Sequence, residues 1–190
     1  VWISQNTSFS NISTGIRNIS IVDENVVWAS GYNGSGDGEN YQVFTKTSNG
    51  GSSWSSGSIN LGDDDLGVAM VSAISSTTAW AVGYPTVAGD IGGIWKTTNG
   101  GTTWSRQDSA SYNSSGSFTN VVHFWDENYG FAQGDPIGGE YELYVTSDGG
   151  NNWEAIPGAN IPNPGGGEYG YVGQIEIVDD NVWFTTNSTT

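Results

Sequence analysis

The nine residues KTTNGGTTW, at positions 96–104, decide the fold of this chain because their pattern occurs three times. KTSNGGSSW at 46–54 and VTSDGGNNW at 145–153 keep the same order of hydroxyl, amide or acid, paired glycines and tryptophan. Consecutive copies begin 50 and 49 residues apart. Self-similarity at a period of about 50 residues is typical of a propeller or another repeat array.

A second element repeats in the same phase. An apolar run, a polar turn and a second apolar run recur at 19–32, 71–84, 121–135 and 175–187. The runs are rich in Val, Ile, Phe and Trp, as strands are, and the turns use Asp and Asn, which bond their own backbone. One further strand leads into each glycine turn and another leaves it. Each unit is therefore predicted to be a four-stranded antiparallel blade.

The predicted fold class is all-β: a β-propeller with blades of about 50 residues that is incomplete at the C-terminus of this chain. A closed ring of four blades is the minimal alternative, and a ring of roughly six to eight blades is favoured. The chain is interpreted as one partial propeller with a closing strand that carries Trp2, three blades and half of a further blade, at 1–15, 16–60, 68–110, 118–160 and 171–190.

The repeated glycine–tryptophan motif, called a box here, is interpreted as structural. Glycine supplies the positive φ of a tight turn, Thr and Asn or Asp side chains bond turn amides, and the tryptophan ring anchors the hairpin. A ligand site is expected to differ between blades, whereas the box is shared by all of them. The box residues are Thr47, Asn49, Gly51, Trp54, Thr97, Asn99, Gly101, Trp104, Thr146, Asp148, Gly150 and Trp153.

The boxes resemble the Asp-box, or BNR repeat, of sialidases, sortilin-like receptors, xyloglucan-degrading glycosidases and propeller-type photosystem assembly factors. The resemblance covers essentially the whole chain, although two of the three boxes have Asn where the family has Asp. The stretches YGFAQGDPIGGEYELYVTSDGGNNW (129–153) and IPNPGGGEYG (161–170) are most similar to secreted bacterial Asp-box propellers with a C-terminal sorting domain. The resemblance implies a removed signal peptide, a longer C-terminal region and boxes that lie away from any active face.

Composition excludes several function classes. Four Lys plus Arg against twenty Asp plus Glu give a formal charge of −16, which argues against nucleic acid and anionic membranes as partners. No apolar run approaches the ~20 residues of a membrane helix, so no membrane insertion is predicted. The chain has no cysteine for disulfides or thiolate metal sites. Abundant Gly, Ser, Thr and Asn with scarce lysine favour an extracellular or cell-surface location.

Catalytic chemistry has little support in the sequence. The sialidase resemblance would require three arginines around a carboxylate, and the chain has only Arg17 and Arg106. His123 has no partner for a catalytic arrangement. A glycosidase needs only two carboxylates, so a glycoside hydrolase with catalytic residues partly outside this chain stays open. The sequence favours a protein without catalytic activity over an enzyme, and no catalytic residue is assigned.

Two acidic loops are candidate calcium sites, with solvated loops as the alternative. Asp37 and Glu39 lie in NGSGDGEN (33–40), which resembles the front of an EF-hand loop but has Phe44 at its twelfth position. The second loop carries three adjacent acids, whose like charges repel unless a cation or water screens them. These are Asp63, Asp64 and Asp65. Calcium is the one cofactor that these loops suggest, and none is certain.

Residues that break the repeat are the candidates for binding. Asp135 stands where the first two units have Tyr32 and Tyr84, with a turn aspartate before a proline as its alternative role. Trp125 is off the tryptophan pattern. With tyrosines on longer loops, it could stack on a sugar or a protein partner. Those tyrosines are Tyr141 and Tyr169, accompanied by Tyr112 and Tyr171.

Three hypotheses follow from these observations. The favoured one is a secreted or cell-surface propeller that serves as a binding or structural module for a glycan or a protein partner. The second is part of a glycoside hydrolase with a sialidase-like fold. The third is a surface or adhesion component that associates with its own copies.

Overall fold

The computed structural model describes residues 3–107 and 111–189, so the predicted strand residue Trp2 lies outside the described residues. Strands come in chain order in sheets of four, four, four and two. The first sheet holds β1 (Thr14–Ile21), β2 (Val27–Asn33), β3 (Val43–Thr47) and β4 (Ser55–Ser58), and the second β5 (Leu66–Ala73), β6 (Ala79–Pro85), β7 (Gly93–Thr97) and β8 (Ser105–Arg106). The third holds β9 (Thr119–Phe124), β10 (Gly130–Ile137), β11 (Glu140–Thr146) and β12 (Glu154–Ala155), and the last β13 (Glu168–Val178) and β14 (Asn181–Ser188).

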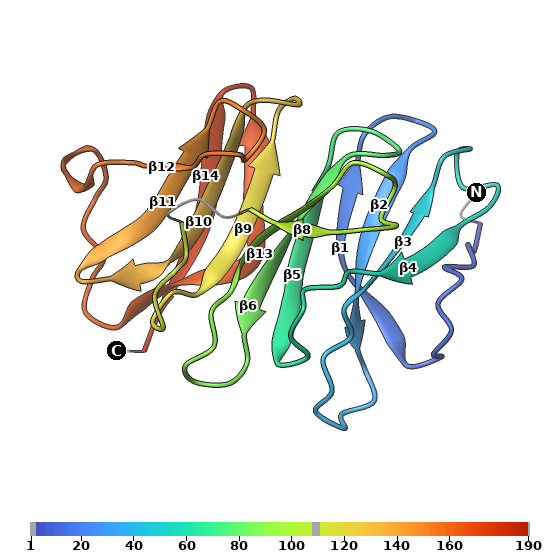
Figure 1. Ribbon diagram of the computed structural model, residues 1–190, viewed down its shortest axis with the longest axis horizontal. Helices are drawn as coiled ribbons and strands as arrows, with labels where there is room; N and C mark the ends of the chain where they lie inside the picture. The colour runs from blue at the N-terminus through green and yellow to red at the C-terminus, as the bar shows by residue number, and fades with distance from the viewer. Residues whose placement is uncertain (1–2, 108–110, 190) are drawn as a thin grey trace.

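The sheets form propeller blades, which confirms the predicted fold class. Every strand pair is antiparallel and joins neighbours in the chain. Figure 1 shows the four sheets side by side, from blue to red. Their first strands, β1, β5, β9 and β13, lie innermost and border a shared cavity of about 270 Å³. A single 3-10 turn, Gly158–Asn160, is the helical element in the described part of the chain, and no helix there could span a bilayer.

Each box folds its own turn by the same hydrogen bonds. In the second box, Gly101 N donates to Thr97 Oγ1 at 3.0 Å, and Thr103 N donates to Asn99 Oδ1 at 3.0 Å. The other two boxes repeat these bonds at 2.9–3.0 Å, whether the acceptor is Asn or Asp. Both glycines of each pair have positive φ, for example 73° and 88° at Gly100 and Gly101. The box is therefore a turn that forms with the same hydrogen bonds whether it carries Asn or Asp.

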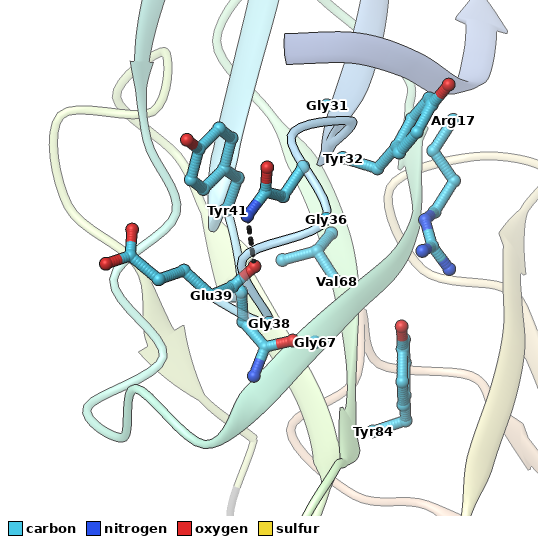
Figure 2. A pocket seen from close by; sticks show the side chains of 12 residues that line it. Arg17, Gly31, Tyr32, Gly36, Gly38, Glu39, Tyr41, Gly67, Val68 and Tyr84 are labelled. Atoms are coloured by element: carbon cyan, nitrogen blue, oxygen red, sulfur yellow. Dashed lines mark hydrogen bonds between the residues drawn. The ribbon is translucent and has the colours of Figure 1, made fainter. Parts of the chain in front are cut away.

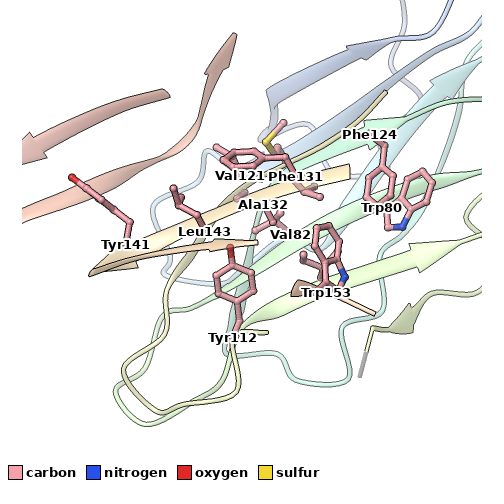
Figure 3. Close-up of a cluster of buried hydrophobic side chains, with 14 residues drawn as sticks. Trp80, Val82, Tyr112, Val121, Phe124, Phe131, Ala132, Tyr141, Leu143 and Trp153 are labelled. Atoms are coloured by element: carbon pink, nitrogen blue, oxygen red, sulfur yellow. The ribbon is translucent and has the colours of Figure 1, made fainter. Parts of the chain in front are cut away.

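The box tryptophans also join neighbouring blades. Trp104, in the second blade, packs edge-on against Trp28 of the first blade, with ring centroids 6.4 Å apart. Trp153 likewise lies beside Phe124, which stacks on Trp80 of the second blade (Figure 3). The ring therefore anchors the hairpin and also fills the interface with the preceding blade.

A lysine bridges each of the first two blade interfaces. Lys46 Nζ lies 4.5 Å from the Trp28 ring and donates at 2.8 Å to the carbonyls of Ser76 and Gly100 in the second blade. Lys96 repeats the contact: its Nζ lies over the Trp80 ring and donates to a carbonyl of the third box. Burial lowers the pKa of both lysines. The interface thus holds a cation between an aromatic face and box carbonyls.

Inner strands are joined by side chains that accept from the next blade's backbone. Val71 N donates to Asn18 Oδ1, and Ala73 N donates to Ser20 Oγ, each at 2.9 Å. Ser72 Oγ accepts from the third blade in the same way, at 3.0 Å. In β1 and β5 this face therefore points to the following blade, and the alternate residues point to the opposite side.

The N-terminal segment lies against the outer part of the first blade. Thr45 Oγ1 donates to the Thr7 carbonyl at 2.6 Å, and Ser56 Oγ donates to the Ser8 carbonyl at 2.6 Å. Residues 3–13 form no strand there. The role of this segment as a closing strand stays a prediction.

We expect Lys46→Met to lower the free energy of unfolding by about 2 kcal/mol, because two charge-assisted bonds between blades are lost. Denaturant unfolding at neutral pH measures the change. Val145→Met is a matched control, since Val145 occupies the same register position in the third blade and is 39% exposed. A change of at most ~0.5 kcal/mol is expected for it. Equal losses in both variants would contradict a role for the ammonium group.

Candidate functional site

The two ends of the blades differ in what they carry. The box turns lie at the upper edge of Figure 1, next to the short turns that join the first two strands of each blade. The loops 33–42, 59–65 and 85–92 lie at the opposite, lower edge. We call this lower surface the loop face. It is where the blades differ, and it carries the two cavities described next.

The loop 33–42 is ordered by its own side chains. Ser35 Oγ donates to Asp37 Oδ2 at 2.6 Å, and Glu39 N donates to Asp37 Oδ1 at 2.9 Å. Asn33 Nδ2 donates to the Glu39 carbonyl at 2.8 Å. Hydrogen bonds from Ser35, Glu39 N and Asn33 hold the pKa of Asp37 below its usual range. Asp37 is therefore ionised and committed to shaping its loop.

Neighbouring loops are tied to this one and enclose an acidic cavity. Asn40 Nδ2 donates to Thr86 Oγ1 at 2.9 Å and to the Asp64 carbonyl at 3.2 Å. The two acidic stretches singled out in the sequence are thereby brought together. They border a cavity of about 560 Å³ lined by Asp37, Gly38, Glu39, Asn40, Asp64 and Asp65.

An aromatic cavity of about 300 Å³ adjoins the acidic one and shares Glu39 with it. Figure 2 shows Tyr32 and Tyr84 on one side and Tyr41 on the other. Tyr32 and Tyr84 lie flat across glycines of the inner strands: a Cβ at Gly67 would lie 2.4 Å from the Tyr84 ring. These glycines are therefore required for the tyrosines to lie there.

Arg17 is the basic residue of this cavity. It is the extra residue of a β-bulge in β1, between Ile16 and Asn18, and its guanidinium lies 5.7 Å from the centre of the Tyr84 ring in the next blade. The equivalent bulges in β5 and β9 carry Ala69 and Asn120. An arginine thus stands at this bulge position in the first blade only, and its guanidinium lies against a tyrosine ring of the cavity wall.

The predicted calcium ligands do not gather into a metal centre. Among the described residues no group of three or more His, Asp or Glu side chains is placed to hold a metal ion. Asp63 uses its carboxylate to accept from the Asp65 amide at 2.9 Å. Calcium stays a prediction from the sequence, without a ligand cluster to support it.

Asp135 joins the third blade to the last sheet. Its Oδ1 accepts from Asn120 Nδ2 and from Gly170 N, both at 2.8 Å. Beside it, Asn120 and Gln133 are fully buried, and each keeps a side-chain oxygen without a hydrogen-bond partner among the described residues. Burial raises the pKa of Asp135, while the bonds from Asn120 and Gly170 oppose the rise. The residue that breaks the repeat thus sits in a buried polar cluster between blades.

A second carboxyl lies near Asp135. Burial raises the pKa of Glu142, hydrogen bonds from Ser117 and Tyr144 oppose this rise, and the charge of Asp135 adds to it. Burial, more than the neighbouring Glu168, raises the pKa of Tyr141 to about 12. The third blade therefore contains two interacting carboxyls in a poorly hydrated setting.

Several predicted binding aromatics have structural positions instead. Tyr112 and Tyr141 are 0% and 9% exposed and belong to the core, so the expectation that their rings are exposed for stacking is wrong. Tyr112 lies on a loop whose ring packs against Tyr144 of β11, and Tyr141 lies within β11 itself, which the sequence does not reveal. Tyr169 is half-buried at the start of β13, whereas Tyr171 is 50% exposed.

Trp125 is partly exposed but has a structural partner. Its Nε1 donates to the Asp179 carbonyl of the last sheet at 3.2 Å. In the first blade, Trp28 Nε1 makes the matching bond to the Ser75 carbonyl at 2.9 Å. Phe131, which replaces that tryptophan in the third blade, has no N–H, so Trp125 supplies the bond. His123 lies edge-on against Trp125, and burial lowers its pKa.

Sequence reasoning missed the aromatic cavity. In the sequence, Tyr32 and Tyr84 stand at equivalent repeat positions and Arg17 is one of two arginines, so none of the three indicates a site. The available signal was the bulge position, where an arginine replaces the small or polar residues of the other blades. The pairing of Arg17 with a tyrosine 67 positions later could come only from the packing of blades.

The fold and the loop face define a β-propeller module. No protein-family model matches the chain, and no curated protein matches it. Solved structures do match: "YCF48 bound to D1 peptide" has a TM-score of 0.54 and 19% identity over 94% of this chain and 54% of that one. YCF48 from Cyanidioschyzon merolae has a TM-score of 0.53 and 18% identity over 94% and 57%.

A third similar structure is the GH74 xyloglucanase from Xanthomonas campestris. Its TM-score is 0.52, with 15% identity over 75% of this chain and 21% of that one. The chain spans about half the length of the YCF48 structures it matches. At these identities, the likeness shows the fold alone.

We expect the Glu142→Gln variant to lose less free energy of unfolding than the parent as pH rises. A carboxyl whose folded pKa is raised contributes most below its unfolded pKa of about 4, and that contribution is lost as pH rises through the folded value. The variant should gain about 0.5 kcal/mol relative to the parent at neutral pH, after allowance for solvent screening, and nothing at low pH. Denaturant unfolding at several pH values measures this. Glu24→Gln, in an exposed turn, is the control, and a pH-independent difference at Glu142 would contradict the burial argument.

Proposed function

We propose that this chain is a protein-binding propeller module that holds a basic, extended segment of a partner protein across the loop face. The observation that carries the proposal is the junction of the aromatic and acidic cavities, which share Glu39. A tyrosine-lined wall beside a cluster of carboxylates suits a peptide that alternates apolar or aromatic side chains with Lys or Arg.

Charge supports a basic partner. The chain carries a formal charge of −16, so a cationic segment would be attracted over the whole surface before it docks. Lys46 and Lys96 donate to carbonyls of the following blade, and Arg106 donates to the Gly92 carbonyl at 2.9 Å. Arg17 lies over Tyr84. No basic residue lines the acidic cavity in the described part of the chain.

The loop face is also ordered for binding. Loop 33–42 is bonded internally and to Thr86 and the Asp64 carbonyl, so a ligand would meet a preformed surface and little ordering entropy would be lost. A peptide is the favoured ligand also because the similar YCF48 structure holds one. That observation concerns YCF48 and supports only the class of ligand proposed for this chain.

Arrays of short peptides test this function. We expect the chain to retain Lys- and Arg-containing peptides with interleaved Tyr or Trp, and affinity to fall as salt rises. Asp64→Asn combined with Asp65→Asn should weaken a selected peptide about tenfold, or about 1.4 kcal/mol, as should Tyr32→Ala.

Glu24→Gln combined with Asp180→Asn is the matched control, because it removes the same charge from turns at the box end of the blades. It should leave affinity within about twofold, since the Debye length at physiological salt is about 8 Å. Preference for Glu-rich arrays, or equal losses in the control, would contradict the loop-face site.

A glycoside hydrolase is the second candidate, favoured by one observation. Asp135 and Glu142 are neighbouring carboxyls with raised pKa values, the property required of a general acid. If they act on a glycan, Asp135→Asn should abolish release of reducing ends from xyloglucan while Glu24→Gln retains it. If the unmodified chain releases no reducing ends, the role of Asp135 is structural, because it accepts hydrogen bonds from Asn120 and Gly170 N.

The finer family assignment and the location are part of the same proposal. We infer that the boxes are of the Asp-box type and that the module is secreted or displayed at a cell surface, from the Gly-, Ser-, Thr- and Asn-rich composition. Fractionation of producing cells, with an intracellular marker as control, tests the location. Recovery with that marker would contradict it.

A further inference from the structure

The loop 33–42 begins with the dipeptide Asn33-Gly34, and the second box contains the same dipeptide as Asn99-Gly100. Glycine has no side chain to hinder its own backbone nitrogen, so in this dipeptide the nitrogen can reach the asparagine side chain and displace its amide group. The two pairs have the same intrinsic reactivity. Their surroundings in the fold decide which of them reacts.

The box holds both reacting groups of its pair. Asn99 Oδ1 accepts from Thr97 Oγ1 and from Thr103 N, both at 3.0 Å. Gly100 N donates to the Thr77 carbonyl at 2.8 Å. Thr97 is 1% exposed, and the Gly100 carbonyl also accepts from the lysine that bridges the first two blades. Attack by Gly100 N therefore requires the turn to leave the packed interface between blades, which is a costly opening.

Asn33 is also bonded, but to exposed partners. Its Oδ1 accepts from Ser35 Oγ at 2.6 Å and from Ser35 N at 2.9 Å. Its Nδ2 donates to Asp37 Oδ1 and to the Glu39 carbonyl. Residues 34–39 are all exposed. These bonds therefore lie within one loop and can break without separating two blades.

Gly34 N, the attacking atom of the loop pair, is also held outside any blade interface. It donates at 2.9 Å to the carbonyl of Ser13, which lies in the turn before β1. A Cβ at Gly36 or Gly38 would have no atom within 4 Å, so the middle of the loop has room to move. Opening of this loop frees both reacting groups at a lower free-energy cost than opening of the box.

We propose that Asn33 is a site of spontaneous deamidation in the folded protein and that its conversion loosens the loop face. Gly34 N forms a bond to Asn33 Cγ, the Cγ–Nδ2 bond breaks, and ammonia leaves with the proton of the attacking nitrogen. The product is a cyclic imide. Water then opens the imide at either carbonyl, which gives an aspartate or an isoaspartate whose main chain is longer by one methylene group.

The product removes the bonds that close the loop. An aspartate at this position has no Nδ2 to donate to Asp37 Oδ1 and to the Glu39 carbonyl. Its carboxylate would instead face the ionised carboxylate of Asp37, and these like charges repel. Residues 37–40 border the acidic cavity, so the modification alters the wall of that cavity. Any resulting change in peptide affinity rests on the proposed function, whereas the modification and the loosening do not.

Mass spectrometry of the chain after incubation at mildly alkaline pH tests the proposal, because the attacking nitrogen loses its proton more readily there. In the folded chain, conversion at Asn33 should be at least about tenfold faster than at Asn99, which corresponds to a difference of about 1.4 kcal/mol in opening free energy. In denaturant the two rates should agree within about twofold, since neither pair is then held. Equal rates in the folded chain, or no conversion at Asn33, would overturn the proposal.

The variant Asn33→Asp tests the effect on the loop. The Glu39 amide, which donates to Asp37 Oδ1 in the parent, should exchange its hydrogen at least about tenfold faster in the variant. Asn113→Asp is the matched control, since it adds the same charge at an exposed residue before β9 and should exchange like the parent. Circular dichroism should show the same fold for all three chains. Unchanged exchange in Asn33→Asp would contradict the loosening of the loop.

Both measurements are made without a peptide, so they separate this inference from the proposed function. A chain that converts at Asn33 and binds no basic peptide would contradict the proposed function alone. A chain that binds basic peptides and converts equally at Asn33 and Asn99 would contradict this inference alone.

Discussion

In the first two blade interfaces, the arrangement of the blades depends on a cation held between an aromatic ring and the turn of the next blade. Lys46 and Lys96 each place an ammonium over a tryptophan of their own blade while donating to a carbonyl of the following box. The accepting carbonyls belong to Gly100 and Gly149, the first glycines of their boxes, which have positive φ. The motif that looks like a local hairpin device therefore also sets the spacing between blades, which explains its strict phase in the sequence.

Most of the fold is predictable because it repeats. The boxes and the paired apolar runs placed four strands in each unit, and β1 to β12 follow that prediction. The interfaces were not predictable to the same degree, since they join residues about 50 positions apart whose types vary. Trp125 illustrates this limit: it looked like a surface aromatic, yet it replaces a bond that Phe131 cannot make. When one residue of a blade makes a bond that another has lost, both residues look like departures from the repeat in the sequence.

The candidate site was predictable only in its acidic half. Asp37, Glu39, Asp64 and Asp65 stood out as charged loops, and the structure brings four of the five predicted ligands to one cavity. Their chemistry changed in context, because Asp37 is bonded to its own loop. The aromatic half was hidden because Tyr32 and Tyr84 occupy equivalent repeat positions and looked structural. A repeated residue can thus pack against a glycine of its own blade and also line a cavity between blades.

The structure also separates what a blade needs from what its position in the row leaves free. Every interior face is covered by a neighbour that presents a tryptophan or an inner strand, and the same residue types remain uncovered at Trp183 and Ile21. Loops impose no such constraint, because they lie on an edge that no blade covers. Binding specificity can therefore vary on the loop face without disturbing the interfaces between blades. One repeat thus produces covered interfaces that keep the blades together and a loop face whose residues are free to vary.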